Sequence, residues 1–350
     1  MAQPNPNTID PNDNPVAYST LTVATCNVLN LALPGRAFYP GQDPYSKNEY
    51  ERKVDWLGER IKTLNADVLA VQEVWDEAAL IEAVKRSGLR YKFIAVPGAE
   101  NGPGQHGARG TPRVGLVTRL AVESIDSLVE FPPQAVVDLP GMGLYNRFER
   151  PPLHATLRLK KGPNLHIITA HFKSKRPKLL SDEQGSTIED RDDPATQAQG
   201  SLRSLIMRGA EAVAVRMRVI DMLHRTREPL IMMGDLNDSP HSVTTQLVAN
   251  TSQVAYDRGA YDCALFSAWD VLGDNKLRRD VAFSHIHQGY PEVLDQILVS
   301  EEFTAQSRRA IGEVLRVEVF NDHLFEGRSR AKSDHGFVRA LIRWEQQQGQ

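Results

Sequence analysis

The sequence predicts an α/β fold, on the basis of three observations. Short apolar runs bounded by turn residues alternate with longer segments of helical periodicity along most of the chain. Some runs are apolar throughout, such as residues 230–233 in LIMMGDLNDS, which is typical of strands inside a sheet. Acidic and amide side chains, here Asp235, Asn237 and Asp238, follow directly where this run ends. Because α/β sheets place their chemistry at the carboxyl ends of strands, this stretch is the first candidate for a functional site, although Gly-Asp-x-Asn is also ordinary turn chemistry.

Length and composition favour one large domain over two small ones. The chain has 350 residues and 41% hydrophobic content, enough to bury a sizeable core. We expect residues 1–18 to form a flexible leader and residues 19–350 to form the domain. The formal net charge of -3 provides no global basic field, so any contact with nucleic acid must be local.

The termini and the cysteines bear on the compartment. The first residues lack the basic start and apolar core of a signal peptide, and no apolar run approaches the roughly 20 residues that span a bilayer. These features predict a soluble, cytoplasmic protein, which we expect to be a monomer. Cys26 and Cys263 are not at metal-ligand spacing, and we expect two reduced core thiols rather than a disulfide.

The amino-terminal half begins with a strand and a long loop. Residues 21–26 predict the strand, which Asn27 follows, and residues 31–46 are a loop rich in Gly and Pro. Helical spacing then covers residues 47–64. A second strand ends at Glu73, and Asp76 begins a helix that runs to about residue 86. The next predicted strands span residues 91–96, 114–118, 124–130, 153–159 and 165–169, and His171 follows the last of them.

The carboxyl-terminal half begins with a polar segment. Residues 174–200 contain few apolar side chains, which predicts a mobile insertion within the domain. A long amphipathic helix over residues 202–223 precedes the 230–233 strand, and a short helix covers residues 243–248. The last predicted strands span residues 281–287, 293–299, 314–319 and 336–344.

Polar side chains at the ends of these strands form a candidate site. They are Asn27, Glu73, His171, Asp235, Asn237, Asp295, Asp334 and His335. Carboxylates such as Glu73 and Asp235 are hard oxygen ligands suited to Mg²⁺ or Mn²⁺, and the two histidines exchange protons near neutral pH. Each residue alone has a structural interpretation, since Asn27 can cap a turn and Glu73 can be a solvated carboxylate at a helix start. Their joint occurrence at strand ends favours a site.

The motifs TCNVLN, VQEV, AHFKSK, GDLND, LDQILVS and SDHGF, in this order, resemble the endonuclease/exonuclease/phosphatase superfamily of metal-dependent phosphoesterases. The resemblance covers residues 21–344. It implies a four-layer α/β sandwich, in which two packed mixed β-sheets are flanked by helices and the site lies in a cleft at one sheet edge. It is specific for the superfamily, and much less so for any one activity.

The resemblance also implies roles for residues. The metal would be held by Glu73, with help from Asn27, and Asp334 would lie near a second metal position. Asp235 and Asn237 match the pair that orients the attacking water and the phosphate. His171 matches a phosphoryl-contacting histidine, Arg150 a phosphate-contacting arginine, and His335 with Asp295 a His/Asp dyad. Gln296 departs from the family, in which LDH is frequent where this chain has LDQ.

The function expected from these residues is a metal-dependent phosphodiesterase that uses Mg²⁺ or Mn²⁺, with Ca²⁺ as an alternative ion. Nucleic acid is the favoured substrate, because basic residues follow His171 in KSKRPK and occur at residues 158–161 and 276–279. A lipid headgroup or an inositol phosphate is the alternative, with Phe38 and Tyr39 as candidate membrane-contacting aromatics. A non-enzymatic binding module is a third hypothesis, which would be marked by the loss of site residues. The loops 31–46, 98–113 and 173–200 are expected to surround the cleft and select the substrate.

Overall fold

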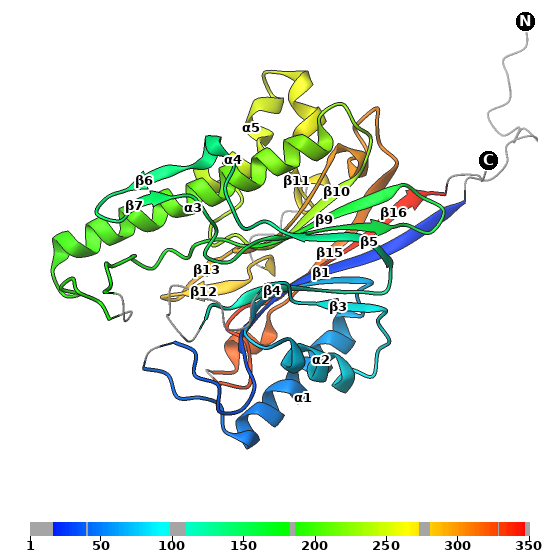
Figure 1. Ribbon diagram of the computed structural model, residues 1–350. Helices are drawn as coiled ribbons and strands as arrows, with labels where there is room; N and C mark the ends of the chain where they lie inside the picture. The colour runs from blue at the N-terminus through cyan, green and yellow to red at the C-terminus, as the bar shows by residue number, and fades with distance from the viewer. Residues whose placement is uncertain are drawn as a thin grey trace, which may run out of the picture.

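A computed structural model describes residues 17–39, 41–98, 110–182, 186–272, 281–327 and 329–346. Two six-stranded sheets pack face to face, and helices cover the outer face of each sheet (Figure 1). The predicted four-layer α/β sandwich is therefore confirmed. Most of the predicted leader and the basic run at residues 276–279 lie outside the described residues.

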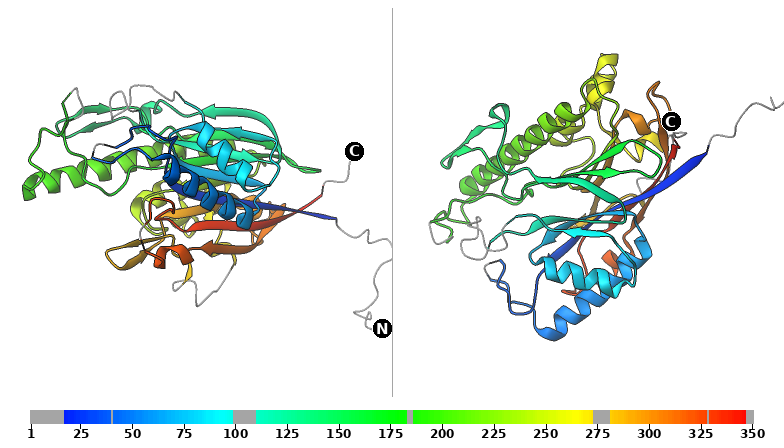
Figure 2. Two further views of the ribbon diagram at one scale, coloured as in Figure 1. Left: turned by 90° about the horizontal axis from the view of Figure 1, so that it is seen from below. Right: turned by 45° about the vertical axis from the view of Figure 1, so that its right-hand side comes forward.

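The first sheet is built around the long strand β1, which pairs with β16 antiparallel and with β2 parallel. Its strand order is β15 (Gly312–Phe320), β16 (Phe337–Glu345), β1 (Tyr18–Leu31), β2 (Val68–Val74), β4 (Arg113–Thr118) and β3 (Phe93–Ala95). Helices α1 (Lys47–Leu64) and α2 (Glu77–Arg86) lie on its outer face (Figure 2).

The second sheet is built around β10, which pairs with β9 parallel and with β14 antiparallel. Its strand order is β11 (Phe266–Ser267), β14 (Asp295–Val299), β10 (Leu230–Asp235), β9 (Asn164–His171), β8 (Leu153–Arg158) and β5 (Ala121–Ser127). Its outer face is covered by α3 (Pro194–Leu223) and α4 (Val243–Ala249), and the short helix α5 (Thr251–Val254) follows α4.

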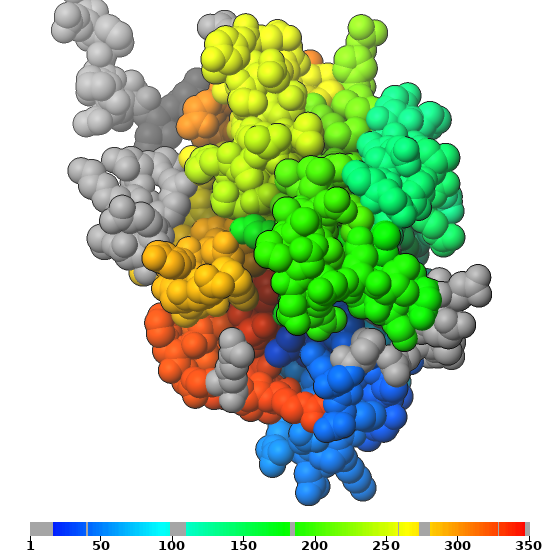
Figure 3. Space-filling model, turned by 90° about the vertical axis from the view of Figure 1, so that its left-hand side faces the viewer, coloured from blue at the N-terminus to red at the C-terminus, as the bar shows by residue number. Residues whose placement is uncertain are grey.

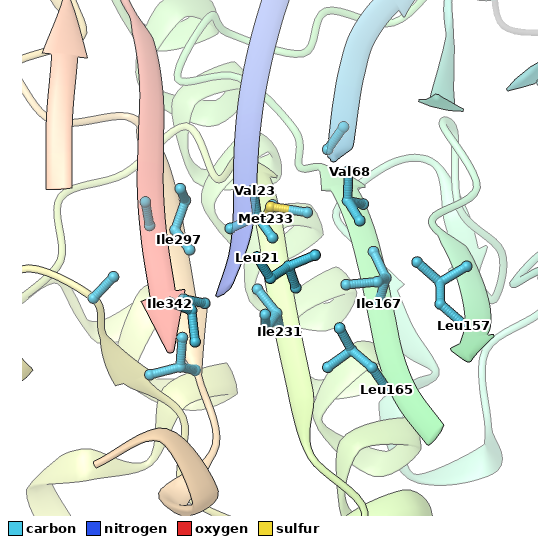
Figure 4. Close-up of a cluster of buried hydrophobic side chains, with 14 of the residues drawn as sticks. Leu21, Val23, Val68, Leu157, Leu165, Ile167, Ile231, Met233, Ile297 and Ile342 are labelled. Atoms are coloured by element: carbon cyan, nitrogen blue, oxygen red, sulfur yellow. The ribbon is translucent and has the colours of Figure 1, made fainter. Parts of the chain in front are cut away.

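Alternating side chains along the strands separate the layers of the core. Leu21 and Val23 point from β1 into the space between the sheets, where they join Ile167, Ile231 and Ile342 (Figure 4). The next residues in the alternation, such as Ala24 and Cys26, pack against the outer helices. This period of two places one apolar set between the sheets and another beneath the helices. Cys26 and Cys263 are free and buried, as predicted.

Local capping chemistry explains where the main helices begin. Ser46 and Glu49 form a capping box at the start of α1, and Asn65 ends the helix in the left-handed conformation. In α3, Asp193 caps the amino terminus through Thr196 N, with Pro194 in the first turn. The helix therefore begins at Pro194, eight residues before the predicted start at residue 202, inside the segment predicted as an insertion.

Two predicted strands have other bounds in the structure. β5 lies three residues earlier than predicted, and only residues 285–287 of the predicted 281–287 strand are extended, as β12 (His285–His287). That strand pairs with β13 (Tyr290–Glu292) as a separate hairpin, and β6 (Val137–Leu139) and β7 (Gly143–Tyr145) form another. Such three-residue strands lack the length that gives alternation a clear signal.

The chain ends and the candidate site lie at opposite ends of the sandwich. β1 begins at Tyr18 beside Glu345 at the end of β16, so the two termini leave from the same end (Figure 1). The parallel pairs β1/β2 and β9/β10 end together at the other end. Among the helices in the described part of the chain, none has both the length and the apolar character needed to cross a bilayer.

Candidate active site

Asp235 is the last residue of β10, and the glycine before it allows β10 to lie close to β9 at this point. Gly234 has φ 153°, and a Cβ built there would lie 1.9 Å from the carbonyl oxygen of Ala170 on β9. Only glycine allows this approach of the two strands. The buried Asp235 carboxylate accepts hydrogen bonds from Asn27 Nδ2 (3.0 Å) and from the backbone N–H of Asn237 (2.9 Å).

Glu73 lies beside Asp235 at the end of β2. Its backbone is left-handed, with φ 64°, a conformation that costs about 1–2 kcal/mol for a residue other than glycine. Two donors hold the carboxylate, namely Asn27 Nδ2 at 3.3 Å and the backbone N–H of Asn30 at 3.0 Å. Asn27 thus links Glu73 of the first sheet to Asp235 of the second. Burial and the charge of Asp334 raise the pKa of Glu73.

The side chains of His335 and Asp295 are both buried and lie within hydrogen-bond distance of each other. His335 Nδ1 lies 2.7 Å from Asp295 Oδ2, and His335 Nε2 lies 3.8 Å from Asp235 Oδ2. Burial alone would lower the pKa of His335, but Asp295 and Asp235 together outweigh it and raise that pKa well above the usual value. Burial raises the pKa of Asp235, although His335 opposes the shift.

The opposite wall of the site carries His171, Arg150 and Asn237. His171 Nε2 lies 3.4 Å from Asp235 Oδ2 and 2.7 Å from Arg150 Nη1. Arg150 Nη2 and Asn237 Nδ2 both donate to the carbonyl oxygen of Phe172, at 2.6 and 2.9 Å. Burial, followed by the charge of Arg150, holds the pKa of His171 well below its ordinary range. The positive charge on this wall therefore belongs to Arg150, and His171 is a neutral hydrogen-bonding ring.

A cleft of about 1370 Å³ opens over these residues. Among the predicted site residues, Glu73, Arg150, His171, Asp235, Asn237, Asp334 and His335 line it directly. Asn27 and Asp295 are buried behind Asp235 and His335. Figure 3 shows a hollow bordered by the blue first loop, the green segment before α3, the golden hairpin β12/β13 and the orange-red segment before β16.

Two residues at or near this cleft could not be recognised from the sequence, namely His285, which lines it, and Lys53, which is buried near it. Lys53 is fully buried on α1 with its Nζ 3.4 Å from the carbonyl oxygen of Arg330, and burial lowers its pKa to about 7. The charges of Glu73 and Asp334 partly oppose this lowering of the Lys53 pKa. His285 lies with its ring centroid 5.0 Å from that of His335. The alternation of SHIH was the only signal for His285, and Lys53 gave none, since a lysine in helical spacing is ordinarily exposed.

The positions of some residues do not favour the contacts predicted for them, namely membrane contact for the two aromatics of the first loop and phosphate contact for Arg158. Phe38 is buried and packs on Tyr45 and Trp75, so it is unavailable for membrane contact, and the partly buried Tyr39 packs on Trp75 as well. Arg158 pairs with Asn164 at the end of the β8/β9 hairpin remote from His171.

Among the described residues, one further group has metal-ligand character: His224, Asp262 and Cys263. There Asp262 is bonded to Arg309 and to the backbone N–H of Arg225, so its carboxylate is already paired with a cation.

Comparison with known proteins identifies the family of this chain. The family model described as the Endonuclease/Exonuclease/phosphatase family matches residues 24–335. No curated protein matches the chain in sequence. Similar solved structures include the human Nocturnin catalytic domain with bound sulfate, at 16% identity and a TM-score of 0.55, covering 93% of this chain and 97% of that one.

Two further structures share the fold. An endonuclease/exonuclease/phosphatase from Bacteroides vulgatus is 14% identical with a TM-score of 0.53, covering 93% of this chain and 100% of that one. Truncated Caenorhabditis elegans TDP2 is 16% identical with a TM-score of 0.52, covering 92% and 97%. Since the family model spans most of the chain and the predicted fold is present, the protein belongs to the Endonuclease/Exonuclease/phosphatase family, whose members are divalent-metal-dependent hydrolases of phosphoester bonds.

Proposed function

We propose that the protein is a divalent-metal-dependent phosphodiesterase that hydrolyses DNA or RNA at Asp235. One observation carries the proposal. A single oxygen, Asp235 Oδ2, lies 3.0 Å from Asn27 Nδ2, 3.4 Å from His171 Nε2 and 3.8 Å from His335 Nε2. An amide and two imidazoles thus converge on one buried carboxylate at the base of a cleft. Four separate segments of the chain contribute to this arrangement, which favours catalysis over a structural role.

The residues present fit a hard divalent cation. Glu73 and Asp334 would hold it, with Asn27 bracing Glu73 through its amide nitrogen, and carboxylate oxygens suit Mg²⁺ or Mn²⁺, with Ca²⁺ as the alternative. Burial and, after it, the charge of Asp334 raise the pKa of Glu73, and a bound cation would offset both effects. When bound, the ion would polarise a phosphoryl oxygen and offset developing negative charge.

The charges of the side chains that line the cleft also favour a bound divalent cation. The carboxylates of the cleft are Asp43, Glu73, Asp235, Glu292 and Asp334, and its basic side chains are Arg150, Lys175, Arg176 and Arg330. The described lining therefore has no excess of positive charge with which to attract a phosphodiester. A bound divalent cation would reverse that balance.

The proton-handling groups are His335 and Asp295. The contact between Nδ1 and Asp295 fixes the ring, so that Nε2 faces Asp235. We assign removal of the proton from the attacking water to the neutral form of His335, with Asp295 stabilising the imidazolium that results. Asp235 orients that water and is the alternative base. Asn237 supports the orientation, because its backbone N–H holds Asp235 Oδ1.

The opposite wall stabilises the phosphoryl group as its charge increases. Arg150 supplies a permanent positive charge, while the low pKa of His171 keeps that ring neutral, with its Nε2 accepting from Arg150 Nη1. The shared bonds of Arg150 and Asn237 to the carbonyl oxygen of Phe172 keep both side chains in place before substrate arrives. Such preorganised donors need no rearrangement when the transition state forms.

Nucleic acid is the substrate that the cleft favours. Its volume of about 1370 Å³ exceeds the roughly 300–1,000 Å³ of pockets for small molecules. Lys175 and Arg176 are exposed on one wall, where they can contact phosphates on either side of the scissile bond. The burial of Phe38 removes one of the two aromatics that suggested a lipid substrate.

A substrate panel tests the proposal. The wild-type protein with Mg²⁺ or Mn²⁺ is assayed on duplex DNA, single-stranded DNA, RNA, sphingomyelin and inositol phosphates. Asp235→Asn should abolish hydrolysis, whereas Asp126→Asn, which changes an exposed carboxylate on β5, should not. Hydrolysis of a lipid or an inositol phosphate without hydrolysis of any nucleic acid would overturn the substrate assignment.

A further inference from the structure

The hairpin β12/β13 lines one side of the cleft. Its two strands are joined by Gln288 (φ 49°) and Gly289 (φ 85°). Two consecutive residues with positive φ are the mark of a type I′ turn, whose twist matches that of antiparallel strands. The backbone bridge between His285 and His335 then fixes the hairpin to the catalytic segment. The hairpin is therefore held in register with the candidate active site.

One face of this hairpin carries a row of rings. The register pairs His285 with Glu292 and His287 with Tyr290, so these four side chains share a face. The ring centroid of His285 lies 5.0 Å from that of His335. His287 stacks on His285 at 6.4 Å with an interplanar angle of 22°. Tyr290, opposite His287, is 75% exposed. We call His285, His287 and Tyr290 the ring row, which runs from the catalytic imidazole to the outside of the molecule.

A charged side chain from across the cleft lies beside the ring row. Lys175 Nζ lies 2.8 Å from Glu292 Oε1, and Glu292 Oε2 lies 3.6 Å from His285 Nδ1. Lys175 follows β9 and His171, so this ion pair links the second sheet to the hairpin. Arg176, next to Lys175, is exposed and also lines the cleft. Flat rings and basic side chains therefore occur side by side.

We propose that the ring row is a base-stacking platform, and that the substrate at the scissile phosphate is an unpaired strand of nucleic acid. This inference rests on the proposed nuclease function and specifies its substrate class. The faces of bases are accessible to side-chain rings only where the strand is unpaired, and sequence-tolerant single-strand binding combines stacked rings with basic residues along the backbone. Lys175 and Arg176 are the basic residues that would contact the adjacent phosphates.

The composition of the hairpin tip argues against membrane insertion. A membrane-inserting segment needs several apolar side chains together. The tip consists of His287, Gln288, Gly289 and Tyr290, in which Tyr290 is the single large apolar ring. A stacking platform needs a flat ring with exposed faces, and Tyr290 meets that requirement.

The test compares three oligonucleotides of one length: a single strand, the same strand in a duplex, and a single strand whose central nucleotides are abasic. KM is measured with Mg²⁺ for the wild type, Tyr290→Leu, Tyr290→Phe and the double variant His287→Leu/Tyr290→Leu. Tyr256→Leu is the matched control, because Tyr256 is 89% exposed and follows α5, outside the β12/β13 hairpin. Tyr290 is exposed, so its replacement leaves the core intact.

We expect Tyr290→Leu to raise KM for the intact single strand roughly five- to hundredfold, the range for one stacked base. The double variant should raise it further, Tyr290→Phe should restore it because the ring is kept, and Tyr256→Leu should match the wild type. On the abasic strand, the wild type and Tyr290→Leu should have similar KM values.

Two results from the KM measurements would overturn the proposal that the ring row is a stacking platform. One is an unchanged KM for the single strand in Tyr290→Leu and the double variant. The other is an equal rise on the intact, abasic and duplex substrates. A third result would overturn it in favour of a membrane contact: both the wild type and Tyr290→Leu bind sphingomyelin vesicles, while Tyr290→Leu and the double variant leave KM on the oligonucleotides unchanged. Failure of the wild type to cleave any of the oligonucleotides would instead overturn the proposed function itself.

Discussion

His335 Nδ1 lies 2.7 Å from Asp295 Oδ2, and both side chains are buried. The backbone around the pair is also fixed, since the Ser333 hydroxyl donates to the carbonyl oxygen of Asn27 and accepts from the backbone N–H of His335. The Ser284 hydroxyl in turn accepts from the backbone N–H of Asp295. Each partner therefore approaches the other from its own anchored segment, and the two should act as one catalytic unit.

Mutation of this pair should be strongly non-additive. His335→Ala should lower kcat by several orders of magnitude, because the ring that handles the proton is lost. Adding Asp295→Ala should cost little more, since Asp295 acts through that ring. Steady-state kinetics of the two single variants and the double variant check this. A double variant whose loss equals the product of the single losses would assign proton transfer to Asp235.

Glu211 on α3 should make stability depend on pH. Its buried carboxylate accepts from Tyr145 Oη (2.8 Å) and from the backbone N–H of Lys173 (2.6 Å), and burial raises its pKa to about 7. A raised carboxyl pKa means that the folded state favours the protonated form. Its stabilising effect is thus greatest below the usual pKa of 4.5 and declines as pH rises to about 7.

Glu211→Gln removes that dependence. Between pH 5 and pH 8, the free energy of unfolding of the wild type minus that of Glu211→Gln should fall by about 2–3 kcal/mol. Urea unfolding of both proteins at the two pH values measures the difference. A difference that is constant or that rises with pH would show that Glu211 is ionised without penalty in the folded protein.

Gly234 should not tolerate a side chain. A Cβ at this position meets the Ala170 carbonyl oxygen at 1.9 Å, so Gly234→Ala must separate β9 from β10 and should destabilise the protein by more than about 3 kcal/mol. Gly209→Ala on α3 is the matched control. A Cβ at Gly209 would have Leu247 Cδ1 of α4 as its nearest neighbour, at an ordinary contact distance of 3.8 Å. That variant should gain roughly 0.5–1 kcal/mol from helix propensity. Equal unfolding free energies for the two variants would contradict the close approach of the strands.

Arg150 should matter for turnover, whereas Arg158 should not. Arg150→Ala removes the charge beside His171 and should lower kcat about 10²–10³-fold, the usual cost of losing one such stabiliser. Arg158 forms an exposed ion pair with Glu123 at the far end of β8, and Arg158→Ala should retain wild-type kinetics. Kinetics of the two variants on one oligonucleotide make the comparison. A larger loss in Arg158→Ala would place substrate at the opposite end of the sandwich.

Features encoded locally could be predicted from the sequence. The bounds of α1 follow from the Ser46 and Glu49 capping box and the left-handed Asn65. The polar residues at strand ends could be grouped because parallel strands end at one edge of a sheet, and Asn27, Glu73, His171 and Asp235 do meet there. The start of α3 was missed because its first turns are polar, although Asp193 followed by Pro194 is a start signal.

Features that depend on distant pairing could not be predicted. Lys53 is buried because the segment of Arg330 covers it, 277 positions away in the chain. Glu73 adopts a left-handed backbone that its residue type does not favour, and the donors Asn27 and Asn30 sustain it. The approach of His285 to His335 likewise arises from a backbone bridge between segments with no shared local pattern.

The measurement that tests the central claim most directly is hydrolysis of an oligonucleotide by the wild-type protein at several Mg²⁺ concentrations, before and after exhaustive chelation with EDTA. We predict that cleavage requires the ion, stops on chelation and returns when Mg²⁺ or Mn²⁺ is restored, because the carboxylates of the cleft repel a phosphodiester without it. Glu73→Gln should shift the Mg²⁺ dependence to higher concentration. Undiminished hydrolysis in EDTA, with the same rate in wild type and Glu73→Gln, would contradict the metal-dependent mechanism.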